Sequence, residues 1–204
     1  MLQTSLVNLS MNRPKWVFLG VLLLTLIAGL QIPSIQVDTD PENMLPADNE
    51  ARVFHDHVKE RFGLHDMIVV GVVNNSAKGI YNPQSLAELQ QLSDAIVQMD
   101  GVVSQDLMSL DRVDNISQEG PGTIRFEWMM KQVPQDQAGV EQIRASVERL
   151  PLLNNTLVSG DGKAAGIYVP IIKKSESYRI SGLIQNEIQT LSGSNEYYIS
   201  GLPV

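Results

Sequence analysis

The chain has 204 residues, contains no cysteine and carries a formal charge of -8 at pH 7. The lack of cysteine excludes disulfides, thiol chemistry and cysteine-ligated zinc, and the negative charge argues against binding to nucleic acid and against electrostatic docking onto anionic lipid. About 165 residues remain after the N-terminal region, enough for one domain with a hydrophobic core or for two small lobes.

An apolar stretch from Trp16 to Ile35 is the first element along the chain, and it contains no charged residue. At about 1.5 Å rise per residue, a helix over this stretch is roughly 30 Å long, which matches the hydrocarbon core of a bilayer. A cleaved signal peptide and a buried core helix are the alternatives. A small-x-small cleavage site is missing, and Leu and Val lie on every helix face, so we predict a membrane helix over 16–35.

The charges on either side of this stretch predict its orientation. Residues 1–15 contain Arg13 and Lys15 and no acidic residue, whereas residues 36–50 contain acidic residues and no basic one. Because basic residues stay on the cytoplasmic side of a membrane, the N-terminus is predicted to be cytoplasmic and the rest of the chain to lie outside.

Residues 36–65 are predicted to form a connector and a helix between the membrane and the main domain. Prolines and other turn formers predict an extended connector over 36–47. Asp48 is the predicted N-cap of a helix that ends at Gly63. Its apolar face consists of residues spaced four apart, namely Phe54, Val58 and Phe62.

The main domain begins with a pattern typical of a βαβ unit. Residues 67–73 form a continuous apolar, β-branched run, which predicts a strand covered on both faces. Asn82 as N-cap and Pro83 at the first helical position begin a helix predicted over 83–99. A second strand is predicted over 102–110, and a right-handed crossover is expected between the two strands.

The C-terminal part predicts a hairpin, a helix and a last strand. Asp161-Gly162 lies between two β-prone runs, over 152–159 and 163–172, and is therefore a strong hairpin signal. A helix with one apolar face is predicted over 175–191, and a strand over 196–200 follows it.

The order of these elements predicts an α+β domain over residues 66–204. Without an insert at 111–151 and without the first hairpin strand, the order is β-α-β-β-α-β, the ferredoxin-like or split βαβ arrangement. The two helices, 83–99 and 175–191, are expected on the same face of a single sheet. The strands of this sheet are predicted over 67–73, 102–110, 164–171 and 196–200.

The insert contains the candidate binding residues. Residues 123–130 alternate in polarity, which predicts an amphipathic strand or an interface segment, and a short helix is predicted to follow it. A stretch rich in Met and aromatic side chains lines an adaptable apolar binding surface in some proteins and packs on the domain's own core in others. Both interpretations remain open for Phe126, Trp128, Met129 and Met130.

Catalytic and metal-binding motifs do not stand out in the sequence. His55, His57 and His65 lie near acidic residues, but their spacing is not that of a metal site, and they are predicted to be solvated. Asp161 is assigned to turn formation. The chain has no P-loop, GxGxxG or GxSxG motif. We therefore expect no enzyme activity, no metal and no cofactor.

Several short segments together resemble a known family. They occur in this order along the chain: Arg13-Pro14 before the first apolar stretch, Met44-Leu45-Pro46, Phe62-Gly63 before the strand Ile68-Val69-Val70, Asp100-Gly101-Val102-Val103, Leu157 to Ala165 around the hairpin, and Gly201-Leu202-Pro203. In order and spacing the chain is similar to the N-terminal part of RND (resistance-nodulation-division) superfamily exporters, in the MmpL-like predicted-exporter branch.

This resemblance implies a first membrane helix and a first periplasmic porter-type domain of a proton-driven exporter of hydrophobic or lipid-like substrates. It implies a location in the bacterial inner membrane. The implied partners are the bilayer and the remaining membrane helices and second porter domain of the same transporter, and homo-oligomerisation stays open. A chain that ends at Val204 is expected to be an incomplete portion without proton-relay residues, unable to transport alone. The alternative is a single-pass membrane sensor or a tethered extracytoplasmic binding module.

Overall fold

The computed structural model describes residue 11, residues 13–32 and residues 44–201. The chain divides into two compact units, Met1–Leu45 and Pro46–Val204.

The N-terminal unit contains helix α2, Pro14–Leu30, of 17 residues. None of its residues is buried, Lys15 is its only charged residue, and the hydroxyl of Thr25 donates to the carbonyl of Val21 at 2.9 Å. The helix ends at Leu30, with Gln31 as its C-cap, within the predicted span over 16–35. Residues 33–35 lie outside the described part. Among the described residues, no helix has both the length and the apolarity needed to cross a membrane.

The second unit begins with helix α3, Glu50–Phe62, as predicted, but the N-cap is Asn49 and not Asp48. The Asn49 side chain accepts the N–H of Ala51 at 3.0 Å, which satisfies a free donor at the helix start. Gly63 ends the helix with φ of 60°, as predicted, because a left-handed residue at this position costs a glycine little. The predicted connector over 36–47 lies mostly outside the described residues.

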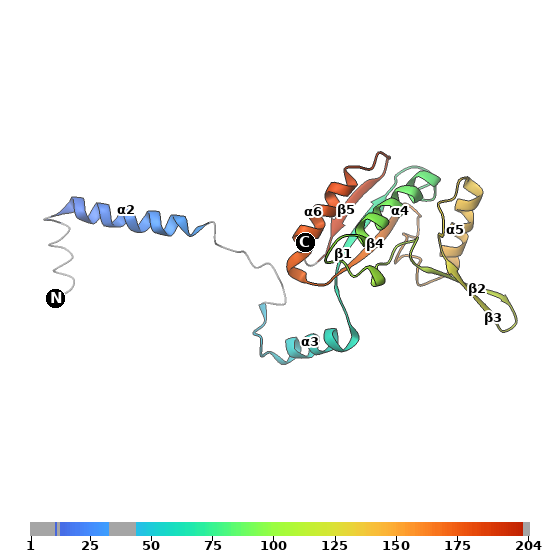
Figure 1. Ribbon diagram of the computed structural model, residues 1–204, viewed down its shortest axis with the longest axis horizontal. Helices are drawn as coiled ribbons and strands as arrows, with labels where there is room; N and C mark the ends of the chain where they lie inside the picture. The colour runs from blue at the N-terminus through green and yellow to red at the C-terminus, as the bar shows by residue number, and fades with distance from the viewer. Residues whose placement is uncertain (1–10, 12, 33–43, 202–204) are drawn as a thin grey trace. The chain divides into compact units, whose positions relative to one another are not determined.

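A three-stranded antiparallel sheet forms the centre of the second unit, in the order β4-β1-β5 (Figure 1). Its strands are β1, Asp66–Val73, β4, Ala164–Ile171, and β5, Glu196–Ser200. Val70 in the middle of β1 pairs with Ile167 on one side and with Ile199 on the other. The fold is thus α+β, and three of the four predicted sheet strands are confirmed.

The predicted strand over 102–110 is wrong, although this segment lies along the free edge of β4. Two isolated bridges, Val102 to Ile171 and Met108 to Tyr168, hold it there. Between them the chain forms a 3-10 turn, η3 (Ser104–Asp106), which interrupts the ladder of hydrogen bonds. The predicted first hairpin strand over 152–159 is likewise replaced by isolated bridges.

Two helices cover one face of the sheet and contact each other, in agreement with the prediction. They are α4, Pro83–Val97, whose N-cap Asn82 accepts the N–H of Ser85 at 2.9 Å, and α6, Ser177–Ile188, which follows the 3-10 turn η4 (Lys174–Glu176). Both are shorter than predicted. Strand β1 was predicted to be covered on both faces, but its residues alternate between buried and half-exposed, because helices pack on one face only.

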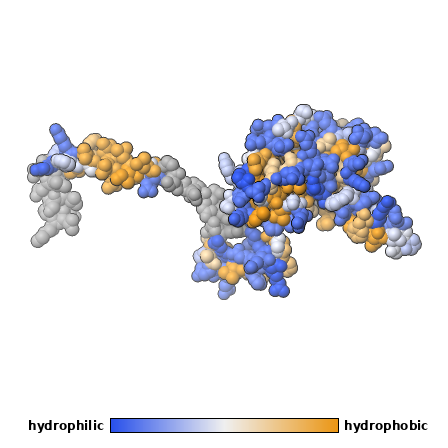
Figure 2. Space-filling model, in the orientation of Figure 1, coloured by the Kyte–Doolittle hydropathy of each residue, from blue (hydrophilic) through white to orange (hydrophobic). Residues whose placement is uncertain are grey.

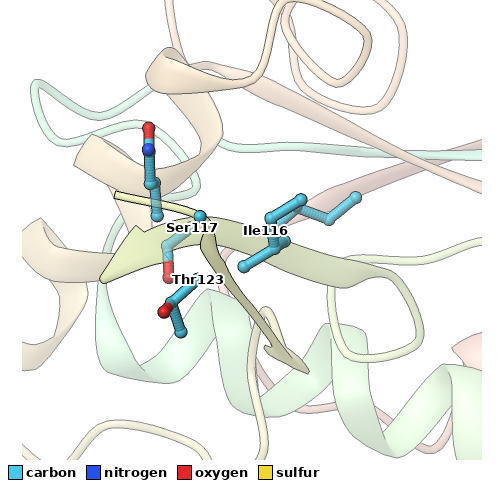
Figure 3. Close-up of a pocket in the computed structure, with 6 residues that line it drawn as sticks. Ile116, Ser117 and Thr123 are labelled. Atoms are coloured by element: carbon cyan, nitrogen blue, oxygen red, sulfur yellow. The ribbon is translucent and has the colours of Figure 1, made fainter. Parts of the chain in front are cut away.

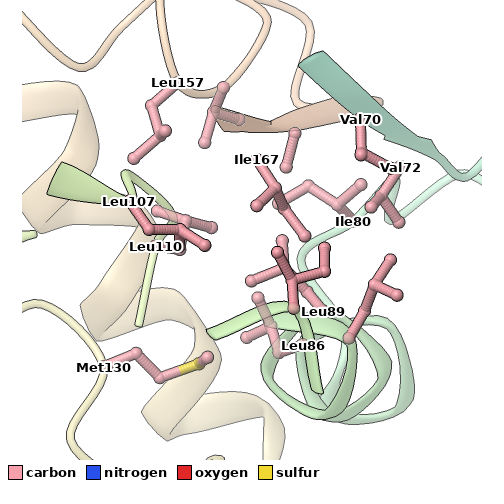
Figure 4. Packing of buried hydrophobic residues seen from close by; sticks show 14 of the residues in the cluster. Val70, Val72, Ile80, Leu86, Leu89, Leu107, Leu110, Met130, Leu157 and Ile167 are labelled. Carbon is pink, nitrogen blue, oxygen red and sulfur yellow. The ribbon is translucent and has the colours of Figure 1, made fainter. Parts of the chain in front are cut away.

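The hydrophobic core lies between the sheet and these helices. Figure 4 shows Val70 and Val72 of β1 and Ile167 of β4 facing Leu86 and Leu89 of α4. All five side chains are fully buried or nearly so. The core therefore lies between the inward-facing residues of β1 and the apolar face of α4.

The buried phenol of Tyr81 makes the stability of this core sensitive to high pH. Burial raises the pKa of Tyr81 to about 12, and Glu148 and Glu141 add to the effect against the opposing charge of Arg144, which lies 5.4 Å from the ring centre. An unfolded tyrosine ionises at about pH 10. The folded protein therefore holds this proton longer than the unfolded chain does, and the resulting stability is present below about pH 10 and is lost toward about pH 12.

We expect Tyr81→Phe to weaken the fall in the free energy of unfolding between about pH 10 and about pH 11.5. Urea unfolding at a series of pH values measures this slope, and Tyr178→Phe, at an exposed tyrosine, is the matched control. An equal slope in wild type and Tyr81→Phe would contradict the burial of the phenol.

Candidate functional site

The insert between the two halves of the sheet forms a hairpin and a helix. Strands β2, Asp114–Gly120, and β3, Thr123–Trp128, pair antiparallel in a separate two-stranded sheet. Gly122 in the connecting turn has φ of 81°, a conformation that glycine adopts at little cost. Helix α5, Gln137–Arg149, follows, with Asp136 as its N-cap and with Val140, Ile143 and Val147 buried in the core.

The register of the hairpin separates its side chains into an apolar and a polar face. Residues paired across the strands point to the same side of a sheet. Ile116 pairs with Phe126, Gln118 with Ile124, and Asp114 with Trp128, whereas Ser117 pairs with Arg125 and Asn115 with Glu127. We refer to Ile116, Ile124, Phe126 and Trp128 as the hairpin apolar face.

This hairpin apolar face is open to solvent. Phe126 is 65% exposed and Trp128 is 55% exposed, and Ile116 and Ile124 are also exposed. Figure 2 shows apolar surface on the hairpin, next to polar atoms of its tip. Contiguous apolar patches on soluble domains mark interaction sites, because their exposure to water is unfavourable.

The four candidate residues from the sequence therefore have two different roles. Met129 and Met130 are 5% and 2% exposed and belong to the core, whereas Phe126 and Trp128 lie on the exposed face. The alternation predicted over 123–130 ends at Trp128, because the chain leaves the strand there and the N–H of Met129 binds the carbonyl of Val113 at 2.9 Å. Ile116 was missed, since only the pairing of the strands places it beside Phe126.

A hollow of about 420 Å³ lies at the hairpin. Ile116, Gln118 and Ile124 line it together with Ser117, Gly122 and Thr123 (Figure 3). Its volume is within the range of small-molecule sites. Ile116 and Ile124 give it an apolar part, beside the polar side chains of Ser117, Gln118 and Thr123.

A second, polar hollow of about 320 Å³ lies between β3 and α5 and shares Trp128 with the hairpin apolar face. The buried amide of Asn115 organises one side of it. Its oxygen accepts from Arg149 at 2.6 Å, and its nitrogen donates to Glu127 at 3.2 Å. Polar groups beside an apolar face fit an amphiphile, which has both kinds of surface.

The remaining candidates from the sequence form no reactive group. His65 lies 3.9 Å from Asp106, and the described residues contain no cluster of three or more possible metal ligands. Asp161 is exposed and accepts from the hydroxyl of Ser159 at 2.6 Å and from the N–H of Lys163 at 3.0 Å, which lowers its pKa. These bonds stabilise the turn, as predicted.

Sequence reasoning also missed a buried carboxylate, Glu88 on α4. It accepts from Asn195 at 2.6 Å and from the phenol of Tyr197 at 2.7 Å, both next to or within β5. Burial, followed by the bond to Glu88, raises the pKa of Tyr197 above its usual value. Both partners are neutral donors more than one hundred positions away, so the cluster fastens β5 to α4 rather than forming a reactive site.

Comparison with models of known protein families finds no match, and comparison with curated proteins also finds none.

Proposed function

We propose that this chain forms the first membrane helix and the first extracytoplasmic domain of a proton-driven RND-type exporter, of the MmpL-like branch, for hydrophobic or lipid-like substrates. The observation that carries the proposal is helix α2, whose large apolar side chains are exposed on all sides.

Helix α2 is better suited to lipid than to water. Its exposed apolar residues include Phe18, Leu22 and Leu26, and no side chain of the helix is buried against another part of the described chain. A helix that is hydrophobic all round belongs in a core or a membrane. Its 17 residues give about 25 Å, and the proposed span is the predicted one over 16–35, whose apolar sequence continues into residues 33–35 outside the described part.

The orientation and fold of the chain support the same proposal. Lys15 lies at the start of α2, which favours a cytoplasmic N-terminus in the inner membrane. In the second unit, β1, α4, the 102–110 segment, β4, α6 and β5 occur in the order of the split βαβ arrangement, and the segment, β4, β1 and β5 lie side by side in that order. We therefore assign the domain to the ferredoxin-like, porter-type class.

The hairpin apolar face is the proposed substrate contact. It offers an exposed apolar surface at Phe126 and Trp128 beside a polar hollow, which matches the two parts of an amphiphilic molecule. The other partners in this proposal are the bilayer and the remaining membrane helices and second porter domain of the same transporter.

Two measurements in cells that naturally make the protein test this proposal. Because the chain has no cysteine, Met11→Cys and Gln189→Cys introduce single thiols at exposed positions on either side of α2. In spheroplasts, a membrane-impermeant maleimide is expected to label Gln189→Cys directly and Met11→Cys only after permeabilisation. The reverse pattern would contradict the orientation.

Transport separates an exporter from a sensor or tethered binding module. Phe126→Glu is expected to raise the retention of the hydrophobic dye Nile red in energised cells, and an uncoupler is expected to abolish the difference from wild type. Arg125→Glu, on the polar face of the same strand, is the matched control. Equal dye retention in wild type and Phe126→Glu would favour the sensor or binding module.

A further inference from the structure

Helix α3 carries an apolar stripe on an otherwise charged surface. Phe54, Val58 and Phe62 are four residues apart, so they lie one above another on a single face. Arg52, Asp56 and Glu60 are on the opposite side of the helix. The helix is well defined at both ends, by the side chain of Asn49 and by the left-handed Gly63.

The stripe of α3 is not covered by the domain. Phe54 and Phe62 are each 69% exposed, and no residue of α3 is buried. By contrast, each of the amphipathic helices α4, α5 and α6 buries apolar residues in the core. Within the described residues, α3 is therefore an amphipathic helix whose apolar face has no partner in its own domain.

We propose that α3 lies in the plane of the membrane interface, with Phe54, Val58 and Phe62 at the boundary between headgroups and acyl chains. The inference rests on the proposed function, in which α2 enters the same bilayer. When a helix with one apolar face, a polar face and low overall hydrophobicity binds a bilayer, it lies in the interface and does not cross it.

The short connection to α2 favours a bilayer as the surface that the apolar face of α3 contacts. Only residues 31–49 separate the two helices, so insertion of α2 holds α3 near the lipid surface at a high effective concentration. A weak apolar contact is then sufficient, because α2 already supplies the anchor.

The size of the stripe argues against a stable protein partner. Two phenylalanines at this exposure and one half-buried valine offer roughly 300 Å², whereas a stable protein interface buries about 800 Å² on each side. The helix is also electrically balanced: Glu50, Asp56 and Glu60 oppose Arg52, Lys59 and Arg61. The contact is therefore expected to form on neutral lipid and to be insensitive to salt.

A tryptophan at the stripe tests the inference in the full chain. The protein has two native tryptophans, Trp16 and Trp128, and both are first replaced by Phe. Phe54→Trp in this background is incorporated into phosphatidylcholine nanodiscs whose lipids are brominated near the headgroup end of the acyl chain. We expect bromine to quench its fluorescence, with and without added salt. Asp56→Trp, on the charged face, is the matched control and is expected to remain unquenched.

The outcomes separate this inference from the proposed function. A variant that keeps Trp16 alone, with Trp128→Phe, reports on the insertion of α2. Quenching of Trp16 without quenching of Phe54→Trp would overturn the interfacial position of α3 and leave the proposed function standing. Failure to quench Trp16 would overturn the membrane insertion on which the proposed function depends. Equal quenching of Phe54→Trp and Asp56→Trp, or loss of quenching in salt, would also overturn the inference.

Discussion

Under the proposed function, in which α2 enters a bilayer, Leu23→Arg is expected to shift the protein from the membrane fraction to the soluble fraction. Leu23 is in the middle of α2, and its side chain is exposed. Exchanging leucine for arginine at the centre of a membrane helix costs about 3 kcal/mol on the insertion scale, which corresponds to about a 100-fold change in partition. We expect this to be the largest single effect on localisation.

Carbonate extraction of membranes, followed by detection of the chain in pellet and supernatant, measures this shift. Leu23→Ile is the matched control, because it keeps the side chain apolar, and it is expected to remain in the pellet. An equal distribution of Leu23→Arg and wild type between the two fractions would show that α2 does not lie within the hydrocarbon core.

Met130→Ala is expected to destabilise the second unit far more than Phe126→Ala, although the two residues are close in sequence and share one apolar alternation. Met130 is fully buried, so its truncation leaves a cavity and costs about 2–5 kcal/mol. Phe126 is mostly exposed, and its truncation is expected to change the free energy of unfolding by less than about 0.5 kcal/mol. Urea unfolding of the full chain, followed by circular dichroism, measures both values.

The same two variants are expected to rank in the opposite order when their affinity for a hydrophobic dye is measured. Under conditions in which both are folded, Phe126→Ala is expected to lose affinity for a hydrophobic dye such as bis-ANS, whereas Met130→Ala is expected to retain the hairpin contribution to binding. Glu119→Ala, at the polar tip of the hairpin, serves as a further control. A large loss of stability in Phe126→Ala would place this side chain in the core and remove it from the proposed substrate contact.

The ends of several elements could be predicted because their signals are local. Asn82 followed by Pro83 predicts the start of α4, and Gly63 predicts the end of α3. A cap or a left-handed glycine acts on the backbone within a few residues, so its effect can be predicted without knowledge of the rest of the chain. The N-cap of α3 shows that such a signal can miss the start of a helix by one residue. Asp48 and Asn49 are adjacent and both are good N-cap residues, but only Asn49 accepts the N–H of Ala51.

Sequence patterns predicted the α+β class, a helix within the apolar N-terminal stretch, and the strands β1, β4 and β5, because each depends on a local run of apolar or β-prone residues. Contacts between distant residues decided the rest. The ladder expected over 102–110 is broken where η3 interrupts the bonds to β4. The pairing of Ile116 with Phe126 creates the hairpin apolar face, while Met130 turns into the core. Burial is a property of packing, so identical apolar patterns can end in solvent or in the core.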